Sequence, residues 1–459
     1  MFSLHNHQQA QIEDAKKAFG SGVQNLLFQA ATGSGKSVMS SYMIKSAVSK
    51  DHRVWFVVPR EQLLTQMSNT FNGFDIQHSF ISAGMPYDSY AKAYVCTLQT
   101  LVKRLGRVHT PNFIVIDETH WGGESINTLI GYAREHRIKV LGLTATPARS
   151  DNFGMGDWYD NMVCGPSIRW LIENKFLSQY KLVRPDTLGR RGNQVTNHVE
   201  TWAKYGNVLK TIVYARDVIH SKAVVQDFNK AGYRFAHMDA KTPSDERNRI
   251  INAFADGELD GISNVFLLTF GFDLASQVGR SVNVRCILDL APTESLTAQM
   301  QKNGRALRYD DAGAAVIIDL AGNSMPESHG FPCAERDWVL DRSDVHRRDV
   351  EIRERILRTM HCKSCLMPSM IGPLNCPHCG APFIADGKKI RIVDGQLVEF
   401  SPDELRQEVE VEKKQIRIEQ GKRKDKDGLI KQGIARGMTR WNAERWAEHV
   451  LRGRNAKKK

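Results

Sequence analysis

A glycine-rich turn between an apolar run and a helix-compatible segment constrains this chain more than any other feature. The run covers residues 26–30, the turn residues 30–37 and the helical segment residues 38–48. Glycines let backbone N–H groups approach phosphate oxygens, and a helix N-terminus adds partial positive charge. The lysine of such a turn reaches the β- and γ-phosphates, and the next hydroxyl can bind Mg²⁺. The pattern predicts a nucleoside triphosphate site formed by Thr32, Gly33, Ser34, Gly35, Lys36 and Ser37. A chance glycine turn is the alternative, because Ala30 stands where the general pattern has glycine.

Length, apolar content and charge limit the class of protein. The chain has 459 residues, of which 41% are apolar, enough for two or three domains with cores. It has no apolar stretch long enough to span a membrane and no N-terminal export signal, so we expect an intracellular protein without membrane contact. The formal charge of +12 favours a polyanionic partner, although a modest excess also serves solvation.

Short β-rich runs alternate with helical stretches in two successive sets, which favours two parallel sheets flanked by helices. The first set of strands is expected at 26–28, 54–58, 94–97, 113–116 and 140–143. The second is expected at 210–214, 233–237, 261–268, 284–289 and 314–319, with helices at 219–231 and 245–255. We expect α/β domains at 1–165 and 166–328, a cysteine-containing region at 329–392, and a charged, partly helical tail at 393–459.

Two adjacent carboxylates follow one of the expected strands. Asp117 and Glu118 come directly after the run 113–116, at the strand end where ligands bind in open α/β sheets. One carboxylate can hold the Mg²⁺ that bridges the phosphates, and the other can orient the attacking water. A pair that merely caps a strand is the alternative, but a phosphate loop in the same domain favours the catalytic interpretation.

These residues give the chain a resemblance to superfamily 2 helicases. Residues 117–120 read Asp-Glu-Thr-His, a DExH box, and the loop has that family's Ala-x-x-Gly-x-Gly-Lys-Ser form. The resemblance covers residues 4–323 and implies two tandem RecA-like domains, an ATP-dependent helicase activity, ATP with Mg²⁺, and catalysis by Lys36, Asp117 and Glu118. Residues 4–9 resemble the family's adenine-reading segment, which makes Gln8 the adenine candidate, although the family's Arg-Pro-Tyr is absent.

Further motifs follow in the family's order. Residues 58–63 and 97–101 resemble its nucleic-acid-contacting motifs, and residues 141–147 resemble the motif that couples hydrolysis to movement. The resemblance implies nucleic-acid contacts from Arg60, Thr97, Gln99 and Thr100, and coupling by Thr144 and Thr146. A turn after a buried strand would also favour Thr and Pro at the coupling positions.

The second half matches the family in three places, of which residues 211–215 resemble the strand that opens the second helicase domain. Residues 269–273 resemble Thr-Glu-Gly-Phe-Asp, which adds Gly271 and Asp273 to the nucleotide site, although Phe270 replaces a polar residue. Residues 301–308 resemble Gln-x-x-Gly-Arg-x-x-Arg, in which Gln301 takes part in coupling. Arg305 and Arg308 would share one helix face and act as arginine fingers, with two surface arginines as the alternative.

A narrower resemblance concerns the segments 291–295 and 318–323, which are similar to those of RadD-like bacterial DNA-repair helicases and their phage and prophage relatives. Residues 329–332 and 338–341 match the same group. The resemblance implies DNA rather than RNA as the partner, possible protein partners in replication or repair, and the cytoplasm of a bacterial or phage-infected cell.

Four cysteines form two Cys-x-x-Cys pairs separated by ten residues: Cys362, Cys365, Cys376 and Cys379. Four thiolates leave no open position on Zn²⁺, so the pattern predicts one structural zinc in a ribbon, with a redox pair or free thiols as alternatives. Whether such a ribbon contacts nucleic acid or only packs against the rest stays open. The other cysteines are expected to be buried thiols: Cys96, Cys164, Cys286 and Cys333.

The sequence therefore predicts an ATP-driven motor on nucleic acid, with ATP between the two α/β domains. Two alternatives remain. One is a nucleic-acid-binding scaffold with little ATPase activity, which Phe270 favours. The other is the motor subunit of a restriction-type system, which would need a nuclease partner. The residues do not separate unwinding from translocation, branch migration or annealing.

Overall fold

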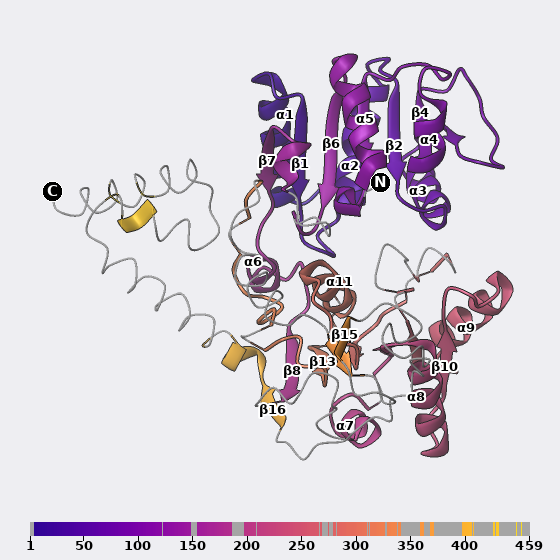
Figure 1. Ribbon diagram of the computed structural model, residues 1–459, viewed down its shortest axis with the longest axis vertical. Coiled ribbons are helices and arrows are strands. Elements are labelled where there is room, and N and C mark those ends of the chain that lie inside the picture. Colours follow the sequence, from indigo (N-terminus) through magenta and orange to yellow (C-terminus); the bar gives the residue numbers. More distant parts are fainter. Residues whose placement is uncertain are drawn as a thin grey trace. The chain divides into compact units, whose positions relative to one another are not determined.

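The computed structural model contains two parallel-rich sheets, each covered by helices (Figure 1). It describes residues 4–121, 123–147, 154–185, 197–207, 209–265, 267–268, 274, 279–280, 282–309, 311, 313–325, 328–336, 338–340, 359–361, 368–370, 397–405, 407, 426, 428–430, 447 and 451. Two compact units divide the chain: Met1–Leu340 with Ile392–Lys414, and Asp341–Arg391 with Gln415–Lys459. Both large sheets belong to the first unit.

The first sheet has the strand order β3-β4-β2-β5-β6-β1-β7, and all its neighbours run parallel. Its strands are β1 (Asn25–Gln29), β2 (Val54–Val58), β3 (His78–Ile81), β4 (Ala93–Thr97), β5 (Phe113–Ile116), β6 (Lys139–Thr144) and β7 (Asn161–Cys164). Because helices cover both faces, the central strands are buried along their whole length. The ends of β1 and β5 therefore lie at one sheet edge, separated only by β6.

Two apolar clusters sandwich this sheet. The helices are α1 (Asn6–Gly20), α2 (Lys36–Val48), α3 (Gln62–Gly73), α4 (Leu98–Arg104), η1 (Thr119–Trp121), α5 (Gly123–Glu135) and η2 (Met155–Asp157). Successive strand residues point to opposite faces, so Phe28 packs with α1, α2 and α3 while Leu27 packs with α4 and α5. The sheet is thus held rigidly from both sides.

The second sheet has the order β10-β11-β9-β12-β13-β8-β16, and it is parallel except for β16, which runs antiparallel to β8. Its strands are β8 (Tyr180–Pro185), β9 (Thr211–Tyr214), β10 (Phe235–Met238), β11 (Gly261–Asn264), β12 (Cys286–Asp289), β13 (Ala315–Asp319) and β16 (Leu397–Phe400). The described helices are α6 (Ile168–Glu173), α7 (His198–Tyr205), α8 (Val218–Lys230), α9 (Ser244–Asp256) and α11 (Leu296–Ala306). The predicted pair of parallel α/β sheets is confirmed.

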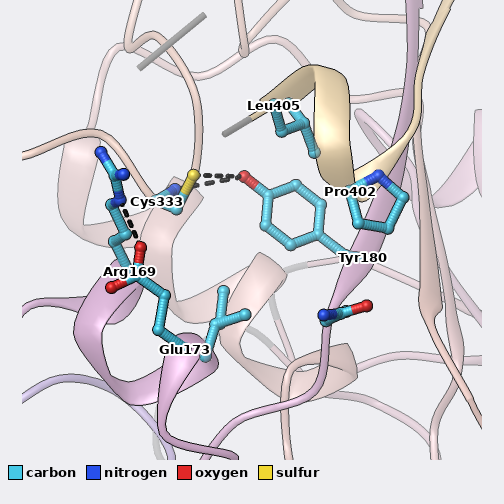
Figure 2. A pocket seen from close by; sticks show the side chains of 8 residues that line it. Arg169, Glu173, Tyr180, Cys333, Pro402 and Leu405 are labelled. Atoms are coloured by element: carbon cyan, nitrogen blue, oxygen red, sulfur yellow. Dashed lines mark hydrogen bonds and ion pairs between the residues drawn. The ribbon is translucent and has the colours of Figure 1, made fainter. Parts of the chain in front are cut away.

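Residues 397–405 bring a late part of the chain back to this sheet. Pro402 and Leu405 cover a small apolar cavity of about 30 Å³ beside β8 (Figure 2). The Tyr180 hydroxyl at its wall donates to Cys333 Sγ at 3.1 Å and accepts from the Cys333 amide at 3.3 Å. The Leu340 carbonyl, in turn, accepts from Gly156 of the first half at 2.8 Å. Leu340 thus contacts the first half, whereas residues 397–405 pack beside the second sheet.

The structure differs from the expectations in several places. Strands β3, β7, β8 and β16 were not predicted, and β11 ends at Asn264 instead of continuing to residue 268. Cys164 is exposed, not buried, because β7 is an edge strand. In the second unit, the described backbone includes an antiparallel pair, β14 (Thr359–His361) and β15 (Pro368–Met370). The four predicted zinc ligands and most of the charged tail lie outside the described residues. Among the helices that are described, none combines the length and apolar character needed to cross a membrane.

Candidate active site

The predicted phosphate loop connects β1 to α2 and depends on two glycines in left-handed conformations. Gly33 has φ +86° and Gly35 has φ +90°, a region that residues with a Cβ rarely adopt. A Cβ at Gly35 would lie 2.5 Å from Gln8 Nε2, and one at Gly33 would lie 2.9 Å from Leu177 Cδ2. Both positions therefore need glycine for backbone geometry and for space.

The loop is braced from within. Lys36 Nζ donates to the Ala30 carbonyl at 3.2 Å, and Ser34 Oγ donates to the Ala31 carbonyl at 2.7 Å. Within the described part of the chain, the buried Thr32 hydroxyl has no hydrogen-bond partner. The two hydrogen bonds thus hold the loop together, and the Thr32 hydroxyl is available to bind a ligand.

Gln8, the adenine candidate, lies against this loop. It is 5% exposed, its Oε1 accepts from the His5 amide at 3.0 Å, and its Nε2 donates to the Ser34 carbonyl at 2.9 Å. The side chain therefore fixes the start of α1 to the phosphate loop. Its contact with adenine stays a prediction.

The two carboxylates follow β5 at the same edge. The Asp117 amide donates to the Val57 carbonyl at 2.8 Å, and Asp117 Oδ1 accepts from the Glu118 amide at 2.9 Å. Glu118 has φ +44°, an uncommon value for a residue with a side chain, and its Oε2 is buried without a hydrogen bond. Burial, followed by the neighbouring Glu118, raises the pKa of Asp117 to about 7. Burial also raises the pKa of Glu118, opposed by Lys36 and Arg305.

A buried histidine connects these carboxylates to the second half. His120 Nδ1 lies 3.4 Å from Glu118 Oε2 and 3.1 Å from Thr144 Oγ1, and burial lowers the pKa of His120 to about 3, so the ring is neutral. Thr144 Oγ1 donates to the Thr146 carbonyl at 2.7 Å, and Thr146 Oγ1 donates to Thr297 Oγ1 at 2.6 Å. This chain of contacts reaches the first turn of α11. The prediction included Thr144 and Thr146 but missed His120 and Thr297. For convenience, we call Asp117, Glu118 and His120 the carboxylate cluster.

Helix α11 carries Arg305 toward the phosphate loop, but it ends at Ala306, and Arg308 lies beyond it in an isolated bridge with Leu177. The expectation that both arginines share one helix face is therefore wrong. Arg305 Nε donates to the Leu268 carbonyl, while Gln301 is buried and its Oε1 has no partner in the described residues. A Cβ at Gly304 would lie 2.5 Å from Thr32 Cγ2, so the helix and the loop approach closely at this glycine. The predicted role of Gln301 in coupling is compatible with this burial.

One cavity of about 280 Å³ brings these elements together. It combines the phosphate loop, the two carboxylates and the two arginines that the sequence motifs singled out. Its lining residues are Thr32, Gly33, Gly35, Lys36, Ser37, Val38, Leu63, Gln66, Asp117, Glu118, Gln301, Gly304, Arg305 and Arg308. Ser37 and Asp117 provide a hydroxyl and a carboxylate, the oxygen ligands that Mg²⁺ prefers. Gly271 and Asp273 lie outside the described residues.

A second buried cluster, the α11 clasp (Asp289, Lys302 and Asn323), lies behind the arginine helix. Lys302 Nζ lies 2.9 and 3.2 Å from the Asp289 carboxylate oxygens and 3.0 Å from the Ala291 carbonyl. Asn323 Nδ2 donates to Asp289 Oδ2 at 2.9 Å, and Asn323 Oδ1 accepts from the Thr293 amide at 2.9 Å. A buried ion pair needs such additional hydrogen bonds to offset desolvation. The clasp therefore fixes α11 to the ends of β12 and β13.

The clasp explains the segments 291–295 and 318–323, which the sequence singled out without a role. One supplies the Ala291 carbonyl and the Thr293 amide, and the other supplies Asn323. The sequence signal was present, but only the fold shows that the two segments meet at Lys302.

The candidate nucleic-acid residues lie along the same edge of the first sheet, which follows from the adjacency of β4, β2 and β5. Arg60 follows β2, is exposed, and places its guanidinium 5.1 Å from the centre of the Trp121 ring. Gln99 and Thr100 begin α4. Thr97 is 5% exposed, and its hydroxyl donates to Ser82 Oγ at 3.1 Å.

No group of three or more His, Cys, Asp or Glu side chains that could hold a metal occurs within the described residues. The predicted zinc cysteines fall outside that part of the chain, so their geometry is untested.

Two family models and several known proteins resemble this chain. Residues 1–149 match the family "Type III restriction enzyme, res subunit", and residues 195–310 match "Helicase conserved C-terminal domain". A 51.5 kDa protein of Lactococcus phage (isolate 7-9) is 29% identical over 409 residues, which cover 84% of this chain and 85% of the relative. The putative ATP-dependent helicase IRC3 of Saccharomyces cerevisiae is 26% identical, over 70% of this chain and 52% of its own length. The present chain thus spans about half of that yeast relative.

Solved structures support the fold. The ATP-dependent Type ISP restriction-modification enzyme LlaBIII bound to DNA matches with a TM-score of 0.52 at 17% identity, over 69% of this chain and 28% of that one. A variant of S. cerevisiae Dbp5 bound to RNA and ADP BeF3 matches with a TM-score of 0.50 at 13% identity, over 77% of this chain and 97% of that one. Both likenesses are consistent with two tandem RecA-like domains.

Proposed function

This chain belongs to the DExH-box helicases of superfamily 2 and is an ATP-dependent helicase, and from that premise we propose that it is a DNA motor with ATP bound between its two sheets. One observation carries the proposal. A single cavity is lined by Lys36, by the carboxylates Asp117 and Glu118, and by Arg305 and Arg308. Phosphoryl transfer requires this combination of charges, because catalysis rests on positioning and electrostatic stabilisation.

Each residue takes a defined role in ATP hydrolysis. Lys36 and the amides of the phosphate loop hold the β- and γ-phosphates. Ser37 and Asp117 would hold Mg²⁺, which when bound neutralises phosphate charge. Glu118 orients the attacking water and accepts its proton, a role that suits a buried carboxylate with a raised pKa. Arg305 and Arg308 stabilise the charge that develops on the transferred phosphoryl group.

A series of contacts leads from Glu118 through His120 and the two threonines to Thr297, and this series couples the chemistry to movement. His120 is neutral and lies between a carboxylate that faces the cavity and Thr144. Loss of the γ-phosphate changes the environment of Glu118, and the threonine hydroxyls transmit the change to α11. Helix α11, which carries Arg305, then shifts relative to the phosphate loop.

We propose that DNA is the nucleic acid along which the motor moves. The RadD-like segments around the α11 clasp and the DNA-bound restriction enzyme among the structural neighbours favour DNA, while the Dbp5 variant is bound to RNA. The formal charge of +12 suits either polyanion. Arg60, Thr97, Gln99 and Thr100 would contact the strand. We place the activity in replication, repair or recombination in the cytoplasm of a bacterial or phage-infected cell, which the phage relative supports.

The decisive experiment compares ATP hydrolysis without nucleic acid and with single-stranded DNA, duplex DNA, forked DNA and RNA. Single-stranded or forked DNA should stimulate hydrolysis most, and Lys36→Ala should remove the activity in every condition. If RNA is the only nucleic acid that stimulates hydrolysis, the motor acts on RNA and not on DNA. Absence of stimulation by any nucleic acid would refute the motor and leave an ATP-binding scaffold.

A restriction-type motor is the second candidate, because the first family model is that of a restriction subunit and LlaBIII is a structural neighbour. Such a motor works with a nuclease. Incubation of this chain with duplex DNA and ATP should leave the DNA intact, whereas addition of a partner nuclease would produce cleavage that depends on Lys36. Cleavage by the purified chain alone would contradict both candidates as stated.

The four clustered cysteines support one structural zinc per chain. Metal analysis of freshly purified protein should find about one Zn²⁺, as expected for four thiolates. Cys362→Ser combined with Cys376→Ser should lower that content, whereas Cys164→Ser, at an exposed cysteine outside the cluster, should not. If freshly purified, active protein contains no zinc, the proposed zinc site is refuted.

A further inference from the structure

An aromatic ring is exposed to solvent next to the proposed catalytic carboxylates. Trp121 ends η1, is 40% exposed, and its amide donates to the Glu118 carbonyl at 3.0 Å. Only two residues separate the indole in sequence from Glu118. Single exposed apolar residues are common on protein surfaces, so the position of this one, and not its exposure alone, is informative.

The ring has a cationic neighbour from another strand. The Arg60 guanidinium lies 5.1 Å from the centre of the Trp121 ring, a cation–π contact. Arg60 follows β2 and Trp121 follows β5, and these strands are adjacent and in parallel register from Val54 with Phe113 to Val57 with Ile116. Both side chains are exposed at the sheet edge on which the candidate strand-binding residues lie.

We propose that Arg60 and Trp121 form a binding site for one unpaired nucleotide, in which the indole stacks on the base and the guanidinium faces the phosphate. The inference rests on the proposed function and adds base stacking to the backbone contacts predicted for Arg60. Aromatic stacking is how proteins hold single strands without reading sequence, because every base has a π-face. Duplex DNA keeps its bases stacked inside, so the site favours single-stranded over double-stranded nucleic acid.

Arg60 and Trp121 also connect the binding of a nucleic-acid strand to the ATP site. The backbone of η1 runs directly from Glu118 through His120 to Trp121, and its turn is closed by the hydrogen bond between Trp121 and Glu118. A base stacked on Trp121 restrains this turn and, through it, the carboxylate that orients water. Strand binding at Arg60 and Trp121 therefore stimulates hydrolysis as well as adding affinity.

The test measures the binding of a fluorescently labelled oligothymidine to Trp121→Ala, Trp121→Phe and Trp170→Ala. Trp170 is a matched control, since it is 38% exposed but packs with His7 and Phe176. Loss of one stacked base should weaken binding roughly 5- to 150-fold in Trp121→Ala. Trp121→Phe should recover most of the affinity, and Trp170→Ala should bind like the wild type.

Two further readouts separate stacking from a structural role. Strand binding should quench the intrinsic fluorescence of the wild type, and Trp121→Phe should bind but lose most of that quench. An oligonucleotide with abasic sites throughout should bind the wild type more weakly, whereas Trp121→Ala should discriminate less between the two strands. A quench that persists in Trp121→Phe, or equal base dependence in Trp121→Ala, would overturn the inference.

The outcome also distinguishes this inference from the proposed function. If the wild type is stimulated by single strands and Trp121→Ala binds them equally well, only the stacking site fails. If the wild type binds no nucleic acid, the motor itself fails, and the stacking site fails with it. Should Trp121→Ala not fold, the fluorescence of Trp121→Phe alone decides.

Discussion

Each of the two sheets has a buried polar cluster near its strand ends. We call one cluster open, because it contains polar atoms without hydrogen bonds, and the other closed, because its polar atoms are paired. In the carboxylate cluster of the first sheet, Glu118 Oε2 and His120 Nε2 are buried and lack hydrogen bonds within the described residues. In the α11 clasp of the second sheet, the Lys302 ammonium has three oxygen partners and Asn323 bonds through both amide atoms.

The difference indicates what each cluster is for. A buried polar atom without a partner costs about 1–3 kcal/mol, so a cluster with two of them can gain stability by binding a ligand. A cluster whose bonds are complete gains nothing from a ligand and instead fixes the position of a helix. One sheet thus carries most of the proposed chemistry, while the other holds in place the helix that carries Arg305.

The largest expected effect comes from Arg305, which lines the same cavity as Glu118. Arg305→Ala should lower the turnover of ATP by about 10³–10⁵, as for other arginine fingers, because the phosphoryl charge loses its partner. The measurement is the rate of phosphate release at saturating ATP and DNA. Arg249→Ala, at an exposed arginine of α9, serves as the control. A loss smaller than tenfold would mean that the second sheet contributes no catalytic group through this arginine.

Glu118→Gln should lower turnover by about 10²–10⁴, the usual contribution of a general base. Binding of ATP should persist, since the amide keeps the size of the carboxylate and Lys36 is unchanged. Turnover and nucleotide affinity are measured on the same preparation. Unchanged turnover would show that Glu118 is not the general base and that the open cluster serves structure and not catalysis.

Lys302→Met should open the closed cluster, because Asp289 would remain buried with its charge unpaired. Removing one partner of a buried ion pair costs about 3–5 kcal/mol, which a denaturant titration can detect. Adding Asp289→Asn should restore part of that stability, since the amide carries no charge. A double variant that is less stable than Lys302→Met would show that the pair is not the source of the effect.

The smallest effect concerns pH. Burial, followed by Arg216, lowers the pKa of His220 from 6.5 to about 4, and its Nδ1 accepts from the Arg216 amide at 3.3 Å. A base with a lowered folded-state pKa stabilises the protein fully above pH 6.5, and this stability is lost as the pH falls toward 4. His220→Gln should therefore make the decrease in melting temperature between these pH values shallower. His109→Gln, at an exposed histidine, is the control, and an equal slope in both variants would contradict the assignment.

Much of the fold was predictable, for a physical reason. Parallel strands covered on both faces are apolar throughout, so β2 and β5 were predicted with their observed bounds. The edge strands β3 and β7 are short and only partly buried, which weakens the signal. Strand β16 pairs with β8 across a long separation in sequence, and local patterns carry no information about such pairing.

The site was predictable residue by residue but not as a network. Lys36, Glu118 and Arg305 follow from their motifs, and the cavity contains all three. The contacts of His120 with Thr144, and of Lys302 with Asp289, join residues from separate strands and helices. Such contacts depend on tertiary packing, which periodicity and spacing do not encode.

The glycine between Gln301 and Arg305 has a mechanical consequence. Because a Cβ at Gly304 would lie 2.5 Å from Thr32 Cγ2, the hydrogen atom of this glycine sets the shortest distance to which the arginine helix and the phosphate loop can approach. A single methyl group there would act as a spacer. It would remove no charged group from the site, yet it would keep Arg305 farther from the phosphates and so weaken catalysis.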